Sequence, residues 1–562
     1  MSSIATSAIP DFISNTGLNP ITVEVIGSAL FSIVEEMGEN LVRSAYSTNI
    51  KERRDCSTAM FDAEGNTLCQ ASHIPGHLGS FIDFVPLVLE RNPLKTIKPG
   101  DVFIGNDAYE GGVTHLPDIV LCEPVFNQDQ LVAWAINTAH HTDFIDRGSA
   151  HIFQEGLRIP PIKLYQAGVL QKDIQDLILL NCQVPRERLS DLRAQMAANR
   201  LGVTRMQALC EKYGIETVRR AGVELMDYSE RRTRAGIAEI PNGTYEFKDI
   251  FDTHAYREDM DFSVKITVRG DEMDVEFQSP PQVRAAINVI YSALRATVYH
   301  AIKSLVDPTV PPNAGLTRPI HVIAKEGTVL RCSAPAAVYG RTSAMQRVVD
   351  MIFGAMAQIV PERVIAAGNG ACTSIYFVGV KPDNSPWTYL ETIGGGSGAR
   401  FTKDGLDGVH VHMTNTSNLP VEAAEGEYPL TILRYELVDE SGGPGKFRGG
   451  MGVRRVYRFE DTCRIGVNSA RVRSHPWGLH GGQPGAVAYF SSSAGEVPAG
   501  VSAEYRKGDR IEIVTAGAGG SGNPAERSSA DVERDLREGR IQRETARRFY
   551  PQVQTSTLSH VG

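Results

Sequence analysis

The chain contains no cysteine pair with CxxC spacing, although it has eight cysteines among 562 residues. They lie far apart, at positions 56, 69, 122, 182, 210, 332, 372 and 463. In a chain of this length, such scatter argues against a disulfide framework and against a structural zinc finger. We interpret the cysteines as buried reduced thiols, and we expect a cytoplasmic protein.

Long apolar runs and an excess of positive charge are also missing. No stretch reaches the roughly 18 apolar residues that a membrane-spanning helix needs. The opening residues MSSIATSAIPDF lack the charged and apolar regions of a secretory signal. The formal net charge is −9, whereas nucleic-acid binders usually carry a basic face. We therefore expect neither membrane insertion nor nucleic-acid binding.

Several motifs of well-known enzyme classes are absent. The chain has no GxxxxGK[ST] phosphate-binding loop, and the nearest segment, SGGPGKF at 441–447, lacks the first glycine and ends in Phe447. A GxGxxG match at 517–522 runs into Asn523-Pro524 rather than a helix, which disfavours dinucleotide binding. No GxSxG and no HExxH occur. Without the GxxxxGK[ST] pattern, the chain carries no recognisable P-loop for ATP.

Hydrophobic periodicity predicts an α+β protein. Asn19 and Pro20 are typical of a helix start, and apolar residues follow at helical spacing. A hairpin is expected over 58–69, and buried strands over 118–125 and 131–138. We expect a flexible lead-in at 1–18, a mixed N-terminal α/β region with the metal site at 19–240, and a central α+β region at 241–430. A β-rich region at 431–525 and a charged helix or arm at 526–562 should follow. The helical middle is expected over roughly 169–233.

Residues able to bind a metal are densest in 105–143, which includes GNDAYEGGVTHLPDIVLCEP and LVAWAINTAHHTDF. His115 and Asp118 lie in a loop that enters one expected strand, and His140 ends the next. Two imidazoles and a carboxylate suit a catalytic divalent ion with an open position. Spacing alone leaves a second interpretation open, in which the histidines are structural and Asp118 caps a turn.

Two further segments are candidates for substrate or anion contact. His73 and His77 belong to the polar loop ASHIPGHLGS and could line the same site. The run ETIGGGSGAR ends in Arg400, and the backbone N–H groups around Gly395 and Gly396 could hold an anion. Tight chain packing explains this glycine run equally well.

Many segments together resemble the hydantoinase B/oxoprolinase family. They include the opening NPITVEVIGSALFSIVEEMGENLVRSAYSTNIKERRDCSTAMFDAEGNTL, then HIPGHLGS, FIGNDAYEGGVTHLPDIVLCEPVF, AHHTDF, EGLRIPP, GGGSGARFTKDGLDGVH, TNTSNLPVEAAE and GGPGKFRGGMG. Their order and spacing hold over roughly 19–550. The family includes the B-type chains of N-methylhydantoinase and caprolactamase, and it is related to the large subunits of acetone and acetophenone carboxylases.

The resemblance implies a division of labour between two subunits. A hydantoinase A-type partner would use ATP and magnesium to phosphorylate the substrate, and this chain would house one divalent metal ion, zinc or manganese. The family's ligands fall on His115, Asp118 and His140, with Asp55 as a fourth acidic candidate. A metal-bound water would then attack the activated ring. His141 or Asp143 would serve as general base or would orient a ligand.

Three functions stay open at this point. The first is ring opening of a cyclic amide such as a hydantoin, 5-oxoproline or a lactam, within an α2β2-like hetero-oligomer. The second is ATP-dependent carboxylation of a ketone of the acetone or acetophenone type. The third is a non-catalytic scaffold for the ATPase partner, which would bind no metal.

Overall fold

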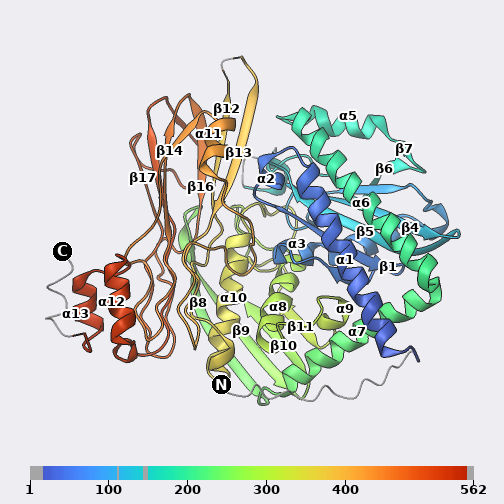
Figure 1. Cartoon of the computed structure of the whole chain (residues 1–562). Coiled ribbons are helices and arrows are strands. Elements are labelled where there is room, and N and C mark those ends of the chain that lie inside the picture. The colour runs from blue at the N-terminus through green and yellow to red at the C-terminus, as the bar shows by residue number, and fades with distance from the viewer. Residues whose placement is uncertain (1–16, 111–112, 143–149, 382, 501, 554–562) are drawn as a thin grey trace.

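The computed structural model confirms an α+β fold of four sheets and the helices that cover them (Figure 1). It describes residues 17–110, 113–142, 150–381, 383–500 and 502–553. Most of the expected lead-in at 1–18 lies outside these residues, as does Asp143.

A seven-stranded antiparallel sheet forms the N-terminal part of the protein. Its order is β2-β1-β5-β4-β3-β6-β7. The strands are β1 (Cys56–Asp62), β2 (Thr67–Gln70), β3 (Val102–Gly105), β4 (Asp118–Asn127), β5 (Gln130–His140), β6 (Ile162–Gln166) and β7 (Val169–Leu170). The β1–β2 hairpin and the two buried strands β4 and β5 confirm the sequence prediction. Their long apolar runs reflect a sheet that is covered on both faces.

Long helices cover one face of this sheet: α1 (Pro20–Ser44), α6 (Pro185–Tyr213) and α7 (Ile215–Ala238) (Figure 1). Asn19 caps α1 as expected, since its side chain accepts a hydrogen bond from the backbone N–H of Ile21. Helices α1 and α6 approach closely at Gly202, where any Cβ would overlap with Met37. Short helices lie on the opposite side, namely α3 (Pro75–Leu78) and α4 (Phe84–Arg91).

A second sheet, in the order β11-β10-β9-β8, carries the largest hydrophobic core. Its strands are β8 (Gly243–Thr253), β9 (Tyr256–Arg269), β10 (Glu272–Gln278) and β11 (Ile320–Ala324). The β9–β10 hairpin follows the alternating pattern of its sequence, with every second residue buried. The helices packed here are α8 (Tyr291–Val306), α9 (Ala314–Thr317) and α10 (Thr342–Met356), and α10 is buried over most of its length.

Two four-stranded sheets share one core in the β-rich C-terminal part. One has the order β13-β12-β16-β18, with β12 (Thr373–Val380), β13 (Pro386–Ile393), β16 (Cys463–Asn468) and β18 (Ala503–Tyr505). The other has the order β14-β15-β19-β17, with β14 (Leu430–Leu437), β15 (Val453–Phe459), β17 (Tyr489–Ser492) and β19 (Arg510–Val514). The boundary expected at residue 430 thus runs between strands of one sheet, because β12 pairs with β16.

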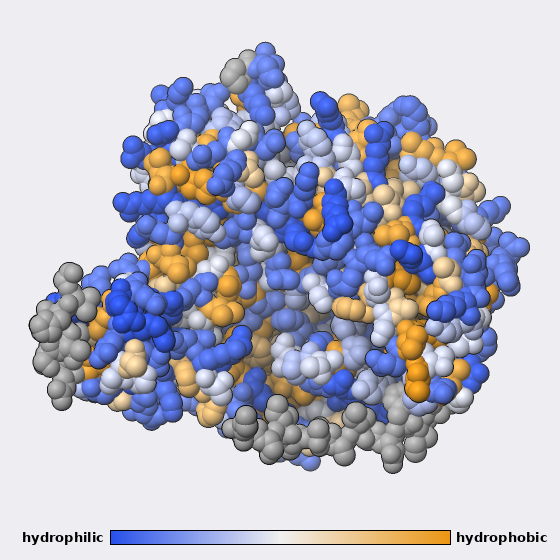
Figure 2. Space-filling view, viewed as in Figure 1, coloured by the Kyte–Doolittle hydropathy of each residue, from blue (hydrophilic) through white to orange (hydrophobic). Residues whose placement is uncertain are grey.

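The remaining helices are short. They are α2 (Thr48–Lys51), α5 (Lys172–Leu180), α11 (Val421–Glu427), α12 (Ser529–Arg537) and α13 (Arg543–Phe549). The charged C-terminal segment forms α12 and α13 around a small core of Val532, Ile541, Ala546 and Tyr550. Apolar residues on the visible face form separate patches among hydrophilic ones (Figure 2). Among the described residues, no helix combines the length and apolar character needed to cross a bilayer.

Candidate metal centre

Three of the candidate ligands meet because of how β4 and β5 pair. Asp118 begins β4 and His140 ends β5, and the antiparallel register places these two residues opposite each other. His115 precedes β4 in a tight loop, in which the N–H of Asp118 donates to the carbonyl oxygen of His115 at 3.2 Å. The N–H of His141 donates to the carbonyl oxygen of Pro117 at 2.8 Å, which fixes this loop against the end of β5.

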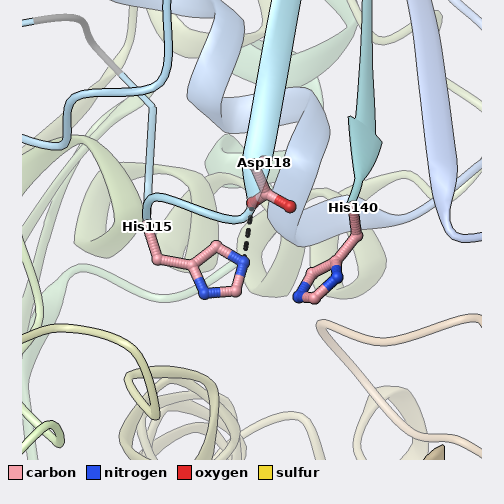
Figure 3. A group of neighbouring side chains, drawn as sticks. All are labelled: His115, Asp118 and His140. Atoms are coloured by element: carbon pink, nitrogen blue, oxygen red, sulfur yellow. Dashed lines mark ion pairs between the residues drawn. The ribbon is translucent and has the colours of Figure 1, made fainter. Parts of the chain in front are cut away.

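The side chains of His115, Asp118 and His140 converge (Figure 3). One ligand atom from each lies within 4.8 Å of the others. His115 Nε2 is 3.1 Å from Asp118 Oδ2, and the two imidazole rings have centroids 4.9 Å apart. All three residues are buried. The three side chains therefore meet at one place, as the ligand interpretation requires.

Unsatisfied atoms at this place fit a cation. His115 Nε2 and Asp118 Oδ1 are buried and make no hydrogen bond among the described residues, although Asp118 Oδ2 lies 3.1 Å from the first atom and His77 Nε2 lies 3.4 Å from the second. The Nδ1–H of His115 faces the carbonyl oxygen of Tyr339 at 3.2 Å, an arrangement that leaves the Nε2 lone pair free. Buried polar atoms without a partner are costly, and a coordinated ion would remove that cost.

The pKa shifts of these groups favour the protonation states in which they can bind a metal. Burial, and then Arg341, lower the pKa of His115 to about 4. Burial and His115 also hold the pKa of His140 well below its ordinary value. Burial alone would raise the pKa of Asp118, but the nearby His115, His77 and Arg341 outweigh it and hold that pKa well below the usual range. At neutral pH the cluster therefore offers uncharged imidazoles and a carboxylate, as metal binding requires.

Asp55 and His77 border the same cavity. His77 Nε2 is 3.4 Å from Asp118 Oδ1 and 3.6 Å from Asp55 Oδ1, so this imidazole lies between two carboxylates. Burial is the main reason why the pKa of Asp55 is raised, although His77 and Arg53 oppose it. Asp55 precedes β1, the neighbour of β5, and the N–H of His140 donates to its carbonyl oxygen at 3.0 Å.

Sequence reasoning missed several residues of this site. Arg341 Nη2 donates to Asp118 Oδ2 at 3.1 Å and also to the Thr114 hydroxyl. Asn49 Nδ2 donates to the carbonyl oxygen of His140 at 2.6 Å and lies 3.3 Å from its Nδ1. The cavity has a volume of about 70 Å³, and its walls include Tyr339, Arg341 and residues of β12 and β13. Arg341 lies 223 residues from Asp118 in sequence, so no local pattern signals it.

The other predicted residues lie elsewhere. His73 lines a separate cavity of about 1060 Å³, and burial lowers its pKa to about 4. His141 Nε2 is hydrogen-bonded to Gln195 Oε1 on α6 at 3.0 Å, and this side chain does not line the cavity. Asp143, the second candidate base, belongs to the residues that the structure does not describe.

The glycine run at 394–400 is a packing feature in this structure. Gly395 and Gly396 abut the backbone of neighbouring segments, and a Cβ at Gly396 would overlap with the carbonyl oxygen of Gly450. The N–H of Arg400 donates to the carbonyl oxygen of Lys403 at 2.9 Å, in a local turn. None of these three residues lines the metal cavity.

Comparison with known proteins agrees with these observations. The family described as Hydantoinase B/oxoprolinase matches residues 19–524. The chain belongs to this family. It is 34% identical over 565 residues to the B-type chain of a putative D-/L-hydantoinase from a Pseudomonas species, covering 94% of each chain. The family resemblance drawn from the motifs is thereby confirmed.

Solved structures agree with the fold. The crystal structure of an ATP-dependent caprolactamase from Pseudomonas jessenii matches with a TM-score of 0.86 at 28% identity, covering 96% of this chain and 97% of that one. A nucleotide-free structure of acetone carboxylase matches with a TM-score of 0.84 at 19% identity, covering 95% and 79%. The second likeness shows the fold alone.

Proposed function

We propose that this chain is the B-type component of an ATP-dependent cyclic-amide hydrolase. The observation that carries the proposal is the buried group of His115, Asp118 and His140, with unsatisfied ligand atoms, in a chain of the hydantoinase B/oxoprolinase family. Relatives are named as components of a hydantoinase and of a caprolactamase, and another is named 5-oxoprolinase, which supports ring opening of a hydantoin, a lactam or 5-oxoproline.

His115, Asp118 and His140 would hold one divalent ion, zinc or manganese. The ion would supply Lewis-acid activation of the acyl carbon and of the attacking water. Two nitrogen ligands and one oxygen ligand suit either metal, so the metal must be identified by measurement. Asp55 would stand beside this group, because it lines the same cavity.

The chain's own residues would orient the ligands and handle a proton. Arg341 and Thr114 hold Asp118 from one side, and the Tyr339 carbonyl oxygen fixes the ring of His115. His77 Nε2, between the carboxylates of Asp55 and Asp118, is placed to hold a proton released during water attack. Burial of these groups limits bulk water around them, which strengthens each electrostatic contact.

A second protein would supply the activated substrate. The sequence contains no phosphate-binding loop for ATP, and several relatives are named as one component of a larger enzyme. We propose a hydantoinase A-type partner that uses ATP and magnesium to phosphorylate the ring carbonyl oxygen. A resonance-stabilised amide is a poor electrophile, and phosphorylation creates the leaving group that it lacks.

The test is reconstitution of the full chain with an A-type partner. Ring opening of hydantoin, 5-oxoproline and caprolactam is followed with and without ATP, and bound metal is measured by elemental analysis. We expect His140→Ala to lose both bound metal and turnover while its circular dichroism is unchanged. His321→Ala, at an exposed histidine, serves as the matched control. Normal metal content and rate in His140→Ala would refute the site.

Carboxylation is tested in the same reconstituted complex. Bicarbonate with acetone or acetophenone replaces the cyclic amide, and ATP-dependent carboxylate formation is measured. The likeness to acetone carboxylase extends to the fold alone at 19% identity, so no observation of the site favours this activity. We therefore expect ring opening without bicarbonate.

A further inference from the structure

The N-terminus of α10 opens into the metal cavity. Gly340, Arg341, Thr342, Ser343 and Met345 all line it. Helix α10 has 15 residues, and no side chain of the described residues caps its N-terminus. The first N–H groups of a helix lack intrahelical acceptors and, together with the helix dipole, favour an anion. This end of α10 therefore presents positive potential beside His115, Asp118 and His140.

A buried hydroxyl at the same place points independently to a ligand. Ser343 is 1% exposed and lines the cavity, and its Oγ has no hydrogen-bond partner among the described residues. Buried hydroxyl groups are nearly always hydrogen-bonded in folded proteins. An anion at the start of α10 would accept a hydrogen bond from this hydroxyl.

Arg341 adds a charged donor. It is 4% exposed, and its Nη2 contacts Asp118 Oδ2 at 3.1 Å and the Thr114 hydroxyl. Its Nη1 lies 3.4 Å from the Thr342 hydroxyl and 3.5 Å from the Tyr339 carbonyl oxygen. The Nε–H is buried and has no partner among the described residues. One donor of the guanidinium is thus left for a ligand.

The net charge around the cavity would favour an anion once a metal is bound. The carboxylates of Asp55 and Asp118 face the guanidinium groups of Arg53 and Arg341, and these charges balance. A divalent ion would then make the cavity positively charged. A neutral amide ring would not compensate this positive charge, whereas an anionic group would.

We propose that Ser343, Arg341 and the N-terminus of α10 form an oxyanion site that binds the phosphoryl group of the activated substrate. The inference deepens the proposed function and rests on it. The ring-opened carboxylate offers related chemistry, but a tetrahedral phosphoryl group presents more oxygens to the hydroxyl, the guanidinium and the backbone N–H groups. Binding here would place the activated carbon next to the three metal ligands.

The test measures binding of inorganic phosphate to the full-length, metal-loaded protein by titration calorimetry. We expect Ser343→Ala to raise the Kd for phosphate about tenfold, as expected for loss of a hydrogen bond to a charged group. Arg341→Lys keeps the charge but loses the fork geometry, and it should weaken binding similarly. Ser292→Ala is the matched control, because Ser292 is also buried with an unpartnered hydroxyl but lies outside this cavity.

Acetate and metal analysis distinguish the remaining outcomes. Acetate should bind more weakly than phosphate and lose less affinity in Ser343→Ala. Unchanged phosphate affinity in both Ser343→Ala and Arg341→Lys would overturn the proposal. The proposal would also be overturned if acetate bound as tightly as phosphate and lost the same affinity in Ser343→Ala. The site would then be a carboxylate site. Normal metal content in Ser343→Ala separates these results from failure of the metal site itself.

Discussion

Replacing Arg341 with methionine would leave a buried carboxylate without its nearest permanent cation. Arg341 Nη2 lies 3.1 Å from Asp118 Oδ2, and the two side chains are 5% and 1% exposed. His115, which contacts the same carboxylate oxygen, has a pKa of about 4 and is uncharged at neutral pH. Breaking a buried ion pair costs about 3–5 kcal/mol, because one charge remains uncompensated. We expect Arg341→Met to lose about 3 kcal/mol of unfolding free energy in metal-free protein.

A divalent cation on Asp118 would replace much of the missing charge, so the loss should shrink when metal is added. Urea unfolding of wild type and Arg341→Met is compared in chelator and in excess manganese. Arg205→Met is the control, because Arg205 forms an exposed pair with Glu36 at 2.9 Å, and such pairs contribute about 1 kcal/mol at most. Equal losses in the two variants in chelator would refute the role assigned to Arg341.

Three further predictions concern pH, metal and packing. Burial raises the pKa of Glu123 to about 7, against the effect of Arg200, so the folded protein binds a proton more tightly than the unfolded chain. Stability should fall by about 3 kcal/mol between about pH 4 and pH 7, and Glu123→Gln should flatten this dependence in urea unfolding. Because the pKa of His115 is about 4, bound metal measured by elemental analysis should persist down to about pH 5; loss near pH 6.5 would contradict the site. Gly396→Ala should lower the melting temperature because of its clash with Gly450, whereas Gly426→Ala, in open space on α11, should not.

The convergence of the three ligands could be predicted because it depends on a local hairpin. Strands β4 and β5 are adjacent in sequence and are joined by a short turn at 128–129. In an antiparallel hairpin, the start of the first strand lies beside the end of the second. Asp118 and His140 therefore meet, and the short loop brings His115 with them. The helix cap at Asn19 was predictable for the same reason, because its side chain bonds to the nearby backbone N–H of Ile21.

Contacts between distant segments were not predictable. The pairing of Arg341 with Asp118 joins α10 to β4, and nothing in either segment specifies the other. The sequence of the glycine run at 394–398 was compatible with both anion binding and tight packing. In the structure, the backbone of Gly450 and Ala516 lies so close to Gly396 and Gly395 that packing accounts for these glycines. The adjacent histidines also separate: His140, the last residue of β5, lines the cavity, whereas His141, just after the strand, contacts Gln195 on α6.

The site depends on elements from three different sheets. The candidate metal ligands come from the paired ends of β4 and β5, which are interior strands of the seven-stranded sheet. The proposed anion donors come from α10, which packs against the sheet of β8 and β9. Leu390 and Thr392 of β13 close the cavity from the C-terminal part. The Arg53 guanidinium links the first and last of these parts, because it donates to the Leu390 carbonyl oxygen at 2.7 Å and lies 3.9 Å from Asp55. The candidate metal ligands and the proposed anion donors are therefore held beside each other only when these three parts of the protein are packed together.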